Sequence, residues 1–221
     1  YEVVGVTMKL YESKSKKKPK TCCSGVDIAD ARNVCKKIGI KHYILNFEKK
    51  FEDSVINEFA TSYINGETPI PCIRCNQTVK FTDLISFTKS INYSVLATGH
   101  YIKRVETSDG INLFCANDNQ KDQSYFLFAT TQEQLKVLRF PLGYFTKNEI
   151  RELASNFGLS VANKSDSQDI CFIPDGNYRE FLKKKKFIEP SEGAIENVKG
   201  KVLGTHDGIA NYTIGQRKGI G

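Results

Sequence analysis

Two cysteines that could do chemistry stand three residues apart in the segment 68–76, which reads TPIPCIRCN. We expect the prolines to hold an extended entry and Asn76 to cap the helix that follows. This predicts that Cys75 lies at a helix N-terminus, where the helix dipole and the neighbouring Arg74 favour the thiolate. The alternative is half of a structural zinc site, which needs a second pair of ligands at similar spacing, and the sequence contains none.

A further cysteine, Cys171, lies in the segment 166–175, which reads DSQDICFIPD. Its apolar neighbours predict a buried core thiol, whereas the polar residues before it could present the thiol at a site. Both interpretations stay open at this point. Cys35 and Cys115 fall in helical and strand patterns and are predicted to be core residues, and Cys22 and Cys23 receive no role.

Composition places the chain among ordinary globular proteins and in a reducing compartment. The 221 residues are 40% hydrophobic and 26% charged, with seven cysteines and no basic-then-apolar leader or membrane-length apolar run. We therefore expect a soluble, cytoplasmic protein without a disulfide framework. The net charge of +7 is concentrated in lysine clusters at 14–20 and 183–186, which are either solvated surface or contacts to a phosphate backbone.

The elements that must position these thiols alternate between strand and helix in the first half of the chain. The pattern predicts strands at 1–10, 41–47 and 93–98, with helices at about 24–39, 51–64 and 76–90. Such alternation indicates an α/β fold with a parallel sheet, whose ligands bind at the carboxyl ends of strands, near Met8 and Gly99. The faces expected to be buried are Val26, Ala29, Val34 and Ile38 in the first helix and Val55, Ile56, Phe59 and Tyr63 in the second.

The second half of the chain changes character twice. From Gln123 onward helices predominate, and Thr146 with Glu149 forms a capping box for a helix that Gly158 ends. Past Pro190, frequent glycines separate short apolar segments, including 212–214, which predicts a β-rich element. We expect a catalytic domain at 1–190 and the start of a small β-rich domain at 191–221.

Five motifs in this order resemble the tRNA-specific 2-thiouridylases across essentially the whole chain. They are PCIRCN at 71–76, ATGHY at 97–101, KDQSYF at 121–126, DICFI at 169–173 and YTIGQRKG at 212–219. The resemblance implies a Rossmann-like sheet of the adenine-nucleotide alpha-hydrolase, or ATP-pyrophosphatase, type. It also implies a sulfurtransferase that adenylates the C2 oxygen of a wobble uridine in tRNA with ATP and Mg²⁺ and replaces that oxygen with persulfide sulfur.

The resemblance also implies roles for individual positions. Cys171 would bear the persulfide and Cys75 would be its partner, so that a transient Cys75–Cys171 disulfide forms in each cycle. Met8 and Gly99 match nucleotide contacts and no metal ligand is implied. Ile70, Pro71 and Cys72 match the stretch that faces the target base, and Lys121, Asp122 and Gln123 match a tRNA contact. The implied partners are tRNA and a persulfide donor, either a cysteine desulfurase or a sulfur-relay protein, with no membrane.

The chemistry of the residues agrees with this expectation. Replacing a carbonyl oxygen by sulfur needs a good leaving group, which adenylation supplies, and a soft nucleophile, which a persulfide supplies. Disulfide exchange then leaves a state that a reductant must reset. The target base must leave the anticodon stack, which suits a closed pocket with basic rims and favours phosphate contacts for the lysine clusters.

The sequence departs from the family pattern at several positions. Residue 1 corresponds to the second strand of the family's sheet, and the pyrophosphate loop that precedes this strand has no counterpart, so a chain beginning at Tyr1 is expected to bind ATP poorly. The segment 24–27 imitates such a loop, but no strand leads into it. The family's C-terminal β-barrel is likewise unmatched, and Ile70 stands where many relatives have Asn.

Two other classes of function remain as alternatives. An ATP-pyrophosphatase that adenylates a small molecule for amide or nitrogen transfer would need neither thiol. A non-enzymatic RNA-binding or zinc-bearing module would hold stoichiometric metal and catalyse no ATP-dependent reaction.

Overall fold

The computed structural model describes residues 1–11, 25–166, 170–173, 176–188 and 191–220. The predicted helix cap at Ser24, the cysteines at 22 and 23 and the first lysine cluster lie outside these residues. Across the described residues, no helix has both the length and the apolar character that crossing a bilayer requires.

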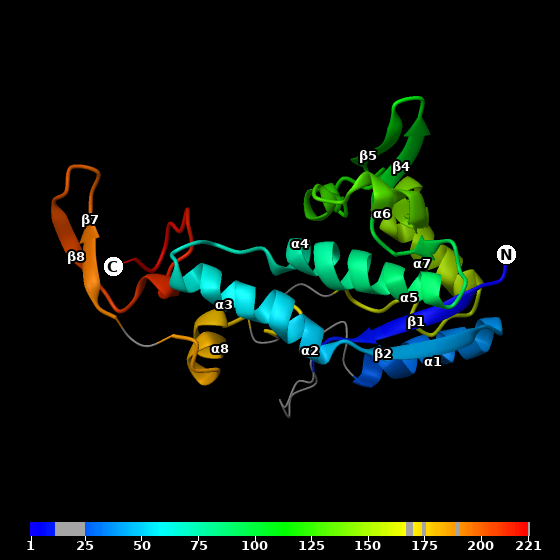
Figure 1. The fold of residues 1–221 in the computed structure, drawn as a ribbon, viewed down its shortest axis with the longest axis horizontal. Helices are drawn as coiled ribbons and strands as arrows, with labels where there is room; N and C mark the ends of the chain where they lie inside the picture. Colours follow the sequence, from blue (N-terminus) through cyan, green and yellow to red (C-terminus); the bar gives the residue numbers. More distant parts are fainter. Residues whose placement is uncertain (12–24, 167–169, 174–175, 189–190, 221) are drawn as a thin grey trace.

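The first unit is a parallel strand pair with a helix between its strands (Figure 1). Strand β1 (Val4–Lys9) pairs in parallel with β2 (Lys41–Asn46), and α1 (Gly25–Ile38) is the crossover between them. Both strands lie within their predicted ranges, and Val6 and Ile44 supply the β-branched bulk typical of them. The α/β fold class with parallel strands is confirmed.

The predicted buried face of α1 is wrong. Val26 is 62% exposed, Ile38 is half exposed, and the residue of α1 that is buried is Cys35. Helix and strand meet where Cys35 packs on Gly5, since a Cβ on that glycine would lie 2.4 Å from the cysteine Sγ. Because glycine allows this close approach, the side of α1 that carries Cys35 faces β1. The prediction that Cys35 is a core residue is confirmed.

Two long helical segments follow and lie side by side in opposite directions (Figure 1). The first consists of α2 (Glu48–Phe51), a π-helical stretch (Glu52–Ile56) and α3 (Asn57–Ile64), and its predicted face is buried. The second consists of α4 (Pro71–Cys75), a π-helical stretch (Asn76–Asp83) and α5 (Leu84–Ser90). The first segment matches its predicted range closely, whereas the second begins five residues earlier than predicted.

A second parallel pair and a hairpin come next. Strand β3 (Leu96–Ala97), shorter than predicted, pairs with β6 (Leu138–Arg139), and β4 (Ile102–Thr107) forms an antiparallel hairpin with β5 (Gly110–Cys115). The helices here are α6 (Gln132–Val137), α7 (Lys147–Asn156) and two 3-10 turns at Ser124–Leu127 and Pro141–Tyr144. The predicted capping box of α7 at Thr146 and Glu149 is confirmed, and Gly158 follows this helix with a φ of +65°.

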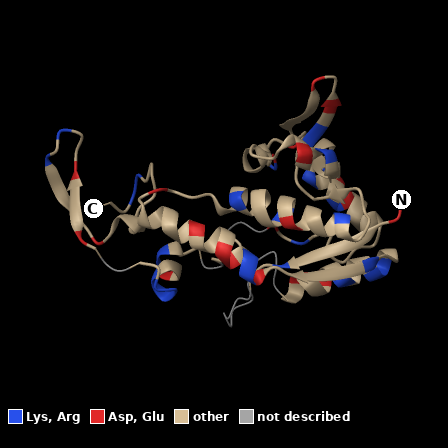
Figure 2. Ribbon diagram, viewed as in Figure 1, with Lys and Arg blue, Asp and Glu red and all other residues tan. Residues whose placement is uncertain are grey.

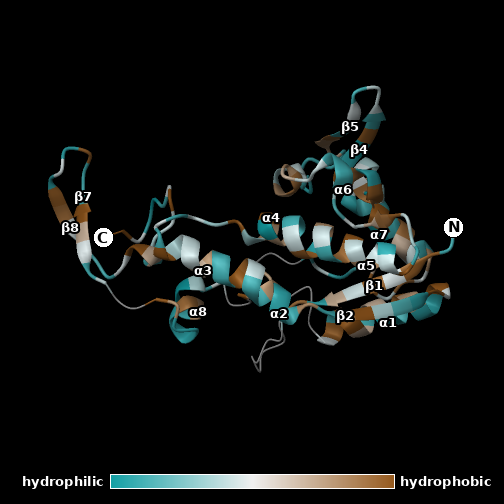
Figure 3. Ribbon diagram, in the orientation of Figure 1, coloured by the Kyte–Doolittle hydropathy of each residue, from teal (hydrophilic) through white to brown (hydrophobic). Residues whose placement is uncertain are grey.

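The last described part contains α8 (Tyr178–Lys184), the hairpin of β7 (Gly193–Glu196) and β8 (Val202–His206), and a 3-10 turn at Ile209–Asn211. The prediction of a β-rich element is confirmed, but its third predicted segment, 212–214, forms no strand. Instead, the backbone N–H of Ile214 donates to Thr68 Oγ1 at 2.9 Å, which ties this end of the chain to the loop before α4. Figure 3 shows the hydrophobic colouring of β8, where Val202 and Leu203 are exposed.

Two hydrophobic clusters organise the interior. One is centred on the first helical segment and includes Phe51, Phe59, Phe172 and Leu182, all at most 1% exposed. The other lies between α5, β3, β4 and β6. Met8 of β1 packs against both clusters, so this strand connects them.

Candidate functional site

Cys75 lies one full turn inside its helix, which corrects the prediction that it marks the N-terminus. The helix begins at Pro71, since proline is tolerated at a first helical position where its missing N–H has no partner to lose. The thiol in the first turn is therefore that of Cys72, which is exposed, whereas Cys75 is buried. The helix dipole cannot be invoked for Cys75, because its effect is confined to the first turn.

Asn76 is not a cap but a buried residue of the continuing helix. Its φ and ψ of −65° and −43° are helical, and its Nδ2 donates to the carbonyl oxygen of Phe126 at 3.1 Å. This bond fixes the helix that carries Cys75 against the segment that follows Lys121. The same bond limits the rotation of the helix, and so the direction of the Cys75 side chain.

Cys171 is half-buried and lies in a short turn, in which the N–H of Ile173 donates to the carbonyl oxygen of Ile170 at 2.8 Å. The next residue, Phe172, is 1% exposed and packs edge-on against Phe51 and Phe59 of the first helical segment. The aromatic ring therefore anchors this turn to the core. The sequence left open whether Cys171 is a buried core thiol or a thiol presented at a site. The turn has features of both, because a buried core residue, Phe172, directly follows a partly accessible thiol.

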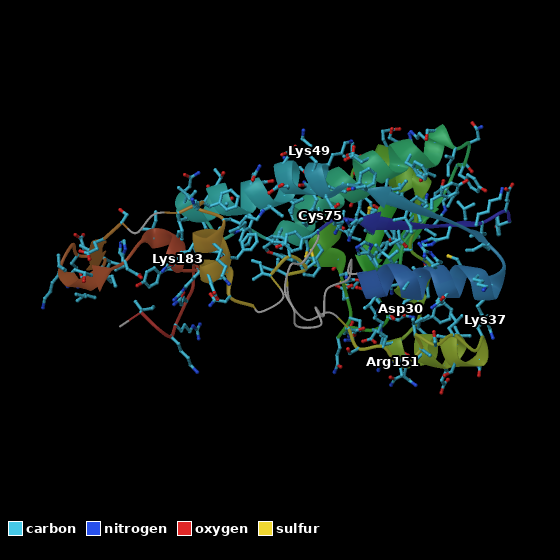
Figure 4. All side chains as sticks on the ribbon, turned by 90° about the horizontal axis from the view of Figure 1, so that it is seen from below. Asp30, Lys37, Lys49, Cys75, Arg151 and Lys183 are labelled. Atoms are coloured by element: carbon cyan, nitrogen blue, oxygen red, sulfur yellow. The ribbon has the colours of Figure 1, made fainter. Side chains whose placement is uncertain are left out.

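The structure brings the two predicted catalytic cysteines into one hydrophobic cluster. Cys75 is a buried member of the cluster around Phe51 and Phe59, and Cys171 packs against the same cluster. Figure 4 shows Cys75 near the centre of the molecule. Two thiols that are far apart in the sequence thus share one region of the interior, which is the precondition for any exchange between them.

The predicted target-base residues lie beside a separate cavity. Ile70 and Pro71 line a cavity of about 290 Å³, but Cys72 is not among its lining residues. The other walls come from the first and second helical segments and the loop between them, namely Val55, Glu58, Phe59, Ser62, Thr68, Pro69, Ile73, Arg74 and Gln77. An ion pair between Arg74 Nε and Glu58 Oε2, 2.5 Å long, spans the two helices at this cavity.

A second cavity, of about 420 Å³, collects Gly99 and the three predicted tRNA contacts, Lys121, Asp122 and Gln123. Gly99 follows the carboxyl end of β3, where ligands of parallel sheets bind. Met8 lies on β1 and lines neither of these two cavities. Of the two predicted nucleotide contacts, the structure therefore brings Gly99 alone to this cavity.

The three predicted tRNA contacts differ in how their side chains are used. Asp122 accepts hydrogen bonds from the backbone N–H groups of Ala116 and Ser124 and from the Ser124 hydroxyl. Burial raises the pKa of Asp122, but these three hydrogen bonds outweigh it and lower that pKa below its usual value. Gln123 accepts from the N–H of Tyr101 at 3.0 Å, and its own backbone N–H donates to the carbonyl oxygen of that tyrosine. Asp122 and Gln123 thus shape the loop, while Lys121 supplies charge to the cavity.

Among the lining residues to which the sequence gave no role are Tyr101, Lys147 and Asp166. Asp166 Oδ2 lies 2.8 Å from Lys121 Nζ, its Oδ1 lies 2.7 Å from Lys147 Nζ, and the ring of Tyr101 lies below the second ammonium. Hydrogen bonds from the two lysines lower the pKa of Asp166 to about 2. The sequence holds two hints at these residues: Lys147 directly follows a helix cap, and Asp166 begins the segment that contains Cys171. Neither hint predicts that the two side chains contact each other in the fold.

His100, next to Gly99, is held neutral by its surroundings. Burial and the charge of Lys80 lower its pKa to about 3, and Thr98 Oγ1 lies 2.8 Å from its Nδ1. The sequence placed this histidine in a matching motif without a role. Its neutral ring can donate one hydrogen bond and accept another but carries no charge at neutral pH.

The remaining cysteines and basic residues lie elsewhere. Cys115 is exposed at the end of β5, so the prediction that it is a core residue is wrong, because its strand belongs to a projecting hairpin (Figure 1). Within the described residues, no group of three or more His, Cys, Asp or Glu side chains is arranged to hold a metal ion. Figure 2 shows basic residues on α8, where Lys184 and Lys185 pair with Glu180 and Glu52.

The chain is similar to known proteins along its whole length. A family model described as the tRNA methyl transferase HUP domain matches residues 1–175, and one described as the tRNA methyl transferase PRC-barrel domain matches residues 179–221. The chain is 55% identical over 223 residues to the tRNA-specific 2-thiouridylase MnmA of Bradyrhizobium sp. (strain BTAi1 / ATCC BAA-1182) and 53% identical over 222 residues to that of Rickettsia canadensis (strain McKiel). All of this chain is covered in both, but it spans only 56% and 60% of the lengths of these relatives.

Proposed function

Because the chain belongs to the tRNA-specific 2-thiouridylase family, we propose that it carries the catalytic centre of a tRNA-uridine 2-sulfurtransferase. The substrate is a wobble uridine of tRNA, and the product is 2-thiouridine. ATP with Mg²⁺ activates the base, and a persulfide donor, either a cysteine desulfurase or a sulfur-relay protein, supplies sulfur. The reaction belongs to a reducing compartment, the cytoplasm, where the thiols are reset after each cycle.

The observation that carries this proposal is the presence of Cys75 and Cys171 in one hydrophobic cluster. Sulfur transfer by a persulfide needs a second thiol that can reach the first, and the two residues meet this need only through the fold. Methyl transfer, which the family model's description names, has no comparable need for two thiols. The relatives' names and the cysteine pair therefore point to the same chemistry.

In the proposed reaction the C2 oxygen of the uridine attacks the α-phosphorus of ATP, and pyrophosphate leaves. The terminal sulfur of the Cys171 persulfide then attacks C2, and AMP leaves with the former carbonyl oxygen. The Cys75 thiolate attacks the Sγ of Cys171, which breaks the bond to the transferred sulfur and releases 2-thiouridine. The two cysteines end as a disulfide, so one two-electron reduction of that disulfide balances the cycle.

The surroundings of the two cysteines suit this sequence of steps. Phe172 holds the turn of Cys171 against the core, and the helix of Cys75 is fixed through Asn76. An apolar environment around a thiol excludes water, which would otherwise hydrolyse the adenylated base. The cavity beside Ile70 and Pro71 adjoins the helix of Cys75 and is our candidate for the flipped base, while that beside Gly99 is our candidate for phosphates.

The test is the formation of 2-thiouridine in unmodified tRNA with ATP, Mg²⁺ and a persulfide source. We expect product from the wild type and none from Cys75→Ser or Cys171→Ser. Cys115→Ser is the matched control, since its thiol is exposed on the hairpin, and it should keep wild-type activity. Non-reducing electrophoresis after one turnover should show the Cys75–Cys171 disulfide in the wild type and in Cys115→Ser, but not in Cys75→Ser or Cys171→Ser.

Full activity in both cysteine variants would overturn the sulfur-transfer mechanism. ATP cleavage without thiolated tRNA would favour the alternative, an ATP-pyrophosphatase that adenylates a small molecule for nitrogen transfer. Stoichiometric bound metal without any ATP-dependent reaction would favour a binding module.

A further inference from the structure

The cavity beside Gly99 is lined by charged side chains from several parts of the chain. A tRNA contact at residues 121–123 alone does not explain this arrangement. Its walls come from the residues that follow β3, from residues within 120–126, from the start of α7 and from Asp166. The lining residues are Gly99, Tyr101, Gln120, Lys121, Asp122, Gln123, Phe126, Lys147 and Asp166. Two lysines and two aspartates therefore face one space, and their formal charges cancel.

The two aspartates are not equivalent. Asp122 is engaged with the N–H of Ala116 at 2.7 Å and with Ser124, so it closes its own loop. Asp166 lies between the two ammonium groups, at 2.8 Å from Lys121 and 2.7 Å from Lys147. One carboxylate thus bridges two cations, so Asp166 balances the charge of each ammonium only in part.

A second observation concerns Tyr101, whose ring lies beside Lys147. Tyr101 lines it and is only 6% exposed, yet its buried hydroxyl has no hydrogen-bond partner in the part of the chain that the structure describes. The ammonium of Lys147 lies 5.8 Å from the centre of the same ring, which keeps this lysine beside the tyrosine. A buried hydroxyl without a partner lowers stability, and this one belongs to a residue that lines the cavity of the two lysines.

We propose that Lys121 and Lys147 form a phosphate subsite, and that Asp166 occupies its two ammonium groups until a phosphate displaces it. A phosphate group offers several oxygens at the spacing of two ammoniums, and bonds from lysine to it are charge-assisted. Asp166 is therefore a competitor for the ligand as well as a structural partner. The assignment of Lys147, Asp166 and Tyr101 to this subsite is new, and it rests on the proposed function.

The phosphate has two possible sources, because Gly99 is expected to contact the nucleotide and Lys121 the tRNA, and both line this cavity. The shared chemistry is a phosphate oxyanion held by two lysines. The two sources are separated by titrating the protein with ATP alone and with an unmodified anticodon stem–loop RNA alone, each at two salt concentrations.

The charge arrangement predicts opposite effects for two substitutions. Lys147→Gln should raise the Kd of the phosphate-bearing ligand about tenfold, since one charge-assisted bond is lost, and for RNA it should also lower the salt dependence. Asp166→Asn should lower the same Kd several-fold, because the competing charge is removed. Lys147→Arg should restore binding, and Lys136→Gln, which changes an exposed lysine paired with Glu133, should have no effect.

A response of the RNA titration assigns the subsite to the tRNA backbone, and a response of the ATP titration assigns it to the nucleotide. Unchanged Kd values for both ligands in Lys147→Gln, or weaker binding in Asp166→Asn, would overturn the subsite. Wild-type 2-thiouridine formation, measured in parallel, separates the two proposals. If 2-thiouridine forms but neither substitution changes the Kd as expected, the subsite alone is refuted. If Lys147→Gln raises the Kd and Asp166→Asn lowers it, but no 2-thiouridine forms, the proposed function alone is refuted.

Discussion

The side-chain amide of Asn76 donates a hydrogen bond to the carbonyl oxygen of Phe126 at 3.1 Å, across a separation of 50 positions in the chain. Asn76 directly follows Cys75, and Phe126 closes the loop that begins with Lys121. The bond therefore connects the cluster of the two cysteines to the cavity of the two lysines. Asn76 is thus a direct structural link between the two places.

The first prediction concerns this bond. Asn76 is 3% exposed, and Asn76→Ala removes the donor while the Phe126 carbonyl stays partly buried. We expect a loss of about 1–3 kcal/mol in the free energy of unfolding, the usual cost of an unmet buried polar group. Urea denaturation measures this loss. Asn156→Ala, at an exposed position of α7, is the control and should stay within about 0.5 kcal/mol of wild type.

An Asn76→Ala variant as stable as the wild type would mean that the bond contributes nothing net. The Asn76→Asp variant gives an independent check, because it brings a carboxylate against the Phe126 carbonyl in a buried position. It should be less stable than the alanine variant, since burying an unpaired charge costs more than losing one hydrogen bond.

The second prediction concerns the anchor of Cys171. Phe172 is 1% exposed and packs edge-on against Phe51 and Phe59 and at a tilt against Phe181, with ring centroids 5.3–5.6 Å apart. We expect Phe172→Ala to cost about 3–5 kcal/mol, the range for truncating a buried phenylalanine. Phe157→Ala is the control, since that ring is 67% exposed, and it should cost no more than about 0.5 kcal/mol.

Thermal or urea unfolding decides between these values. Equal stability of the two variants would show that the turn of Cys171 is not anchored by its neighbour. Phe172→Leu retains most of the apolar volume and should lose less stability than Phe172→Ala, so it allows activity to be measured in a folded protein.

The third prediction concerns pH. Burial, together with the charge of Lys80, lowers the pKa of His100 from 6.5 to about 3 in the folded protein. Between these values the unfolded chain takes up a proton that the folded chain does not, so stability is complete above pH 6.5 and falls as the pH approaches 3. The loss should approach about 1.4 kcal/mol per pH unit well below 6.5.

Urea midpoints of the wild type and of His100→Gln, measured from pH 7 to pH 4, test this prediction. The stability difference between the two proteins should change across this range in favour of the variant at low pH, because glutamine does not titrate. A constant difference would mean that His100 takes up its proton equally in the folded and unfolded states.

The sequence predicted those parts of the fold that depend on local pattern. The face of 51–64 was correct because apolar residues recur at helical spacing, and the cap at Thr146 was correct because it depends on residues three apart. The start at Pro71 was missed because a proline at a first helical position cannot be told locally from one in an extended segment.

The site was predictable to the extent that it depends on motifs, and unpredictable where it depends on tertiary contacts. The motifs identified Lys121, but its ion pair with Asp166 joins two residues far apart in the chain, and no local sequence pattern predicts such a contact. Cys115 was misjudged for the same reason, since a strand pattern does not say whether the strand lies in the core or in a projecting hairpin.

The last prediction concerns Gly143, which lies against the start of β4. A Cβ at this position would lie 2.0 Å from the carbonyl oxygen of Ile102 and 2.8 Å from the backbone nitrogen of Lys103, and backbone atoms cannot rotate away. Its carbonyl oxygen also accepts from the N–H of Asn117, so the glycine is fixed from a second direction. We expect Gly143→Ala to lose about 1–3 kcal/mol in the free energy of unfolding, as overpacking does.

Gly204→Ala is the matched control, because a Cβ at Gly204 in β8 meets no atom within 4 Å among the described residues, and this variant should be nearly neutral. Since Ile102 directly follows Tyr101, a shift of β4 in Gly143→Ala also moves a wall of the cavity that holds the two lysines. The affinity for the phosphate-bearing ligand should therefore fall together with the stability. A variant that loses stability but keeps wild-type affinity would show that β4 can move without disturbing Tyr101.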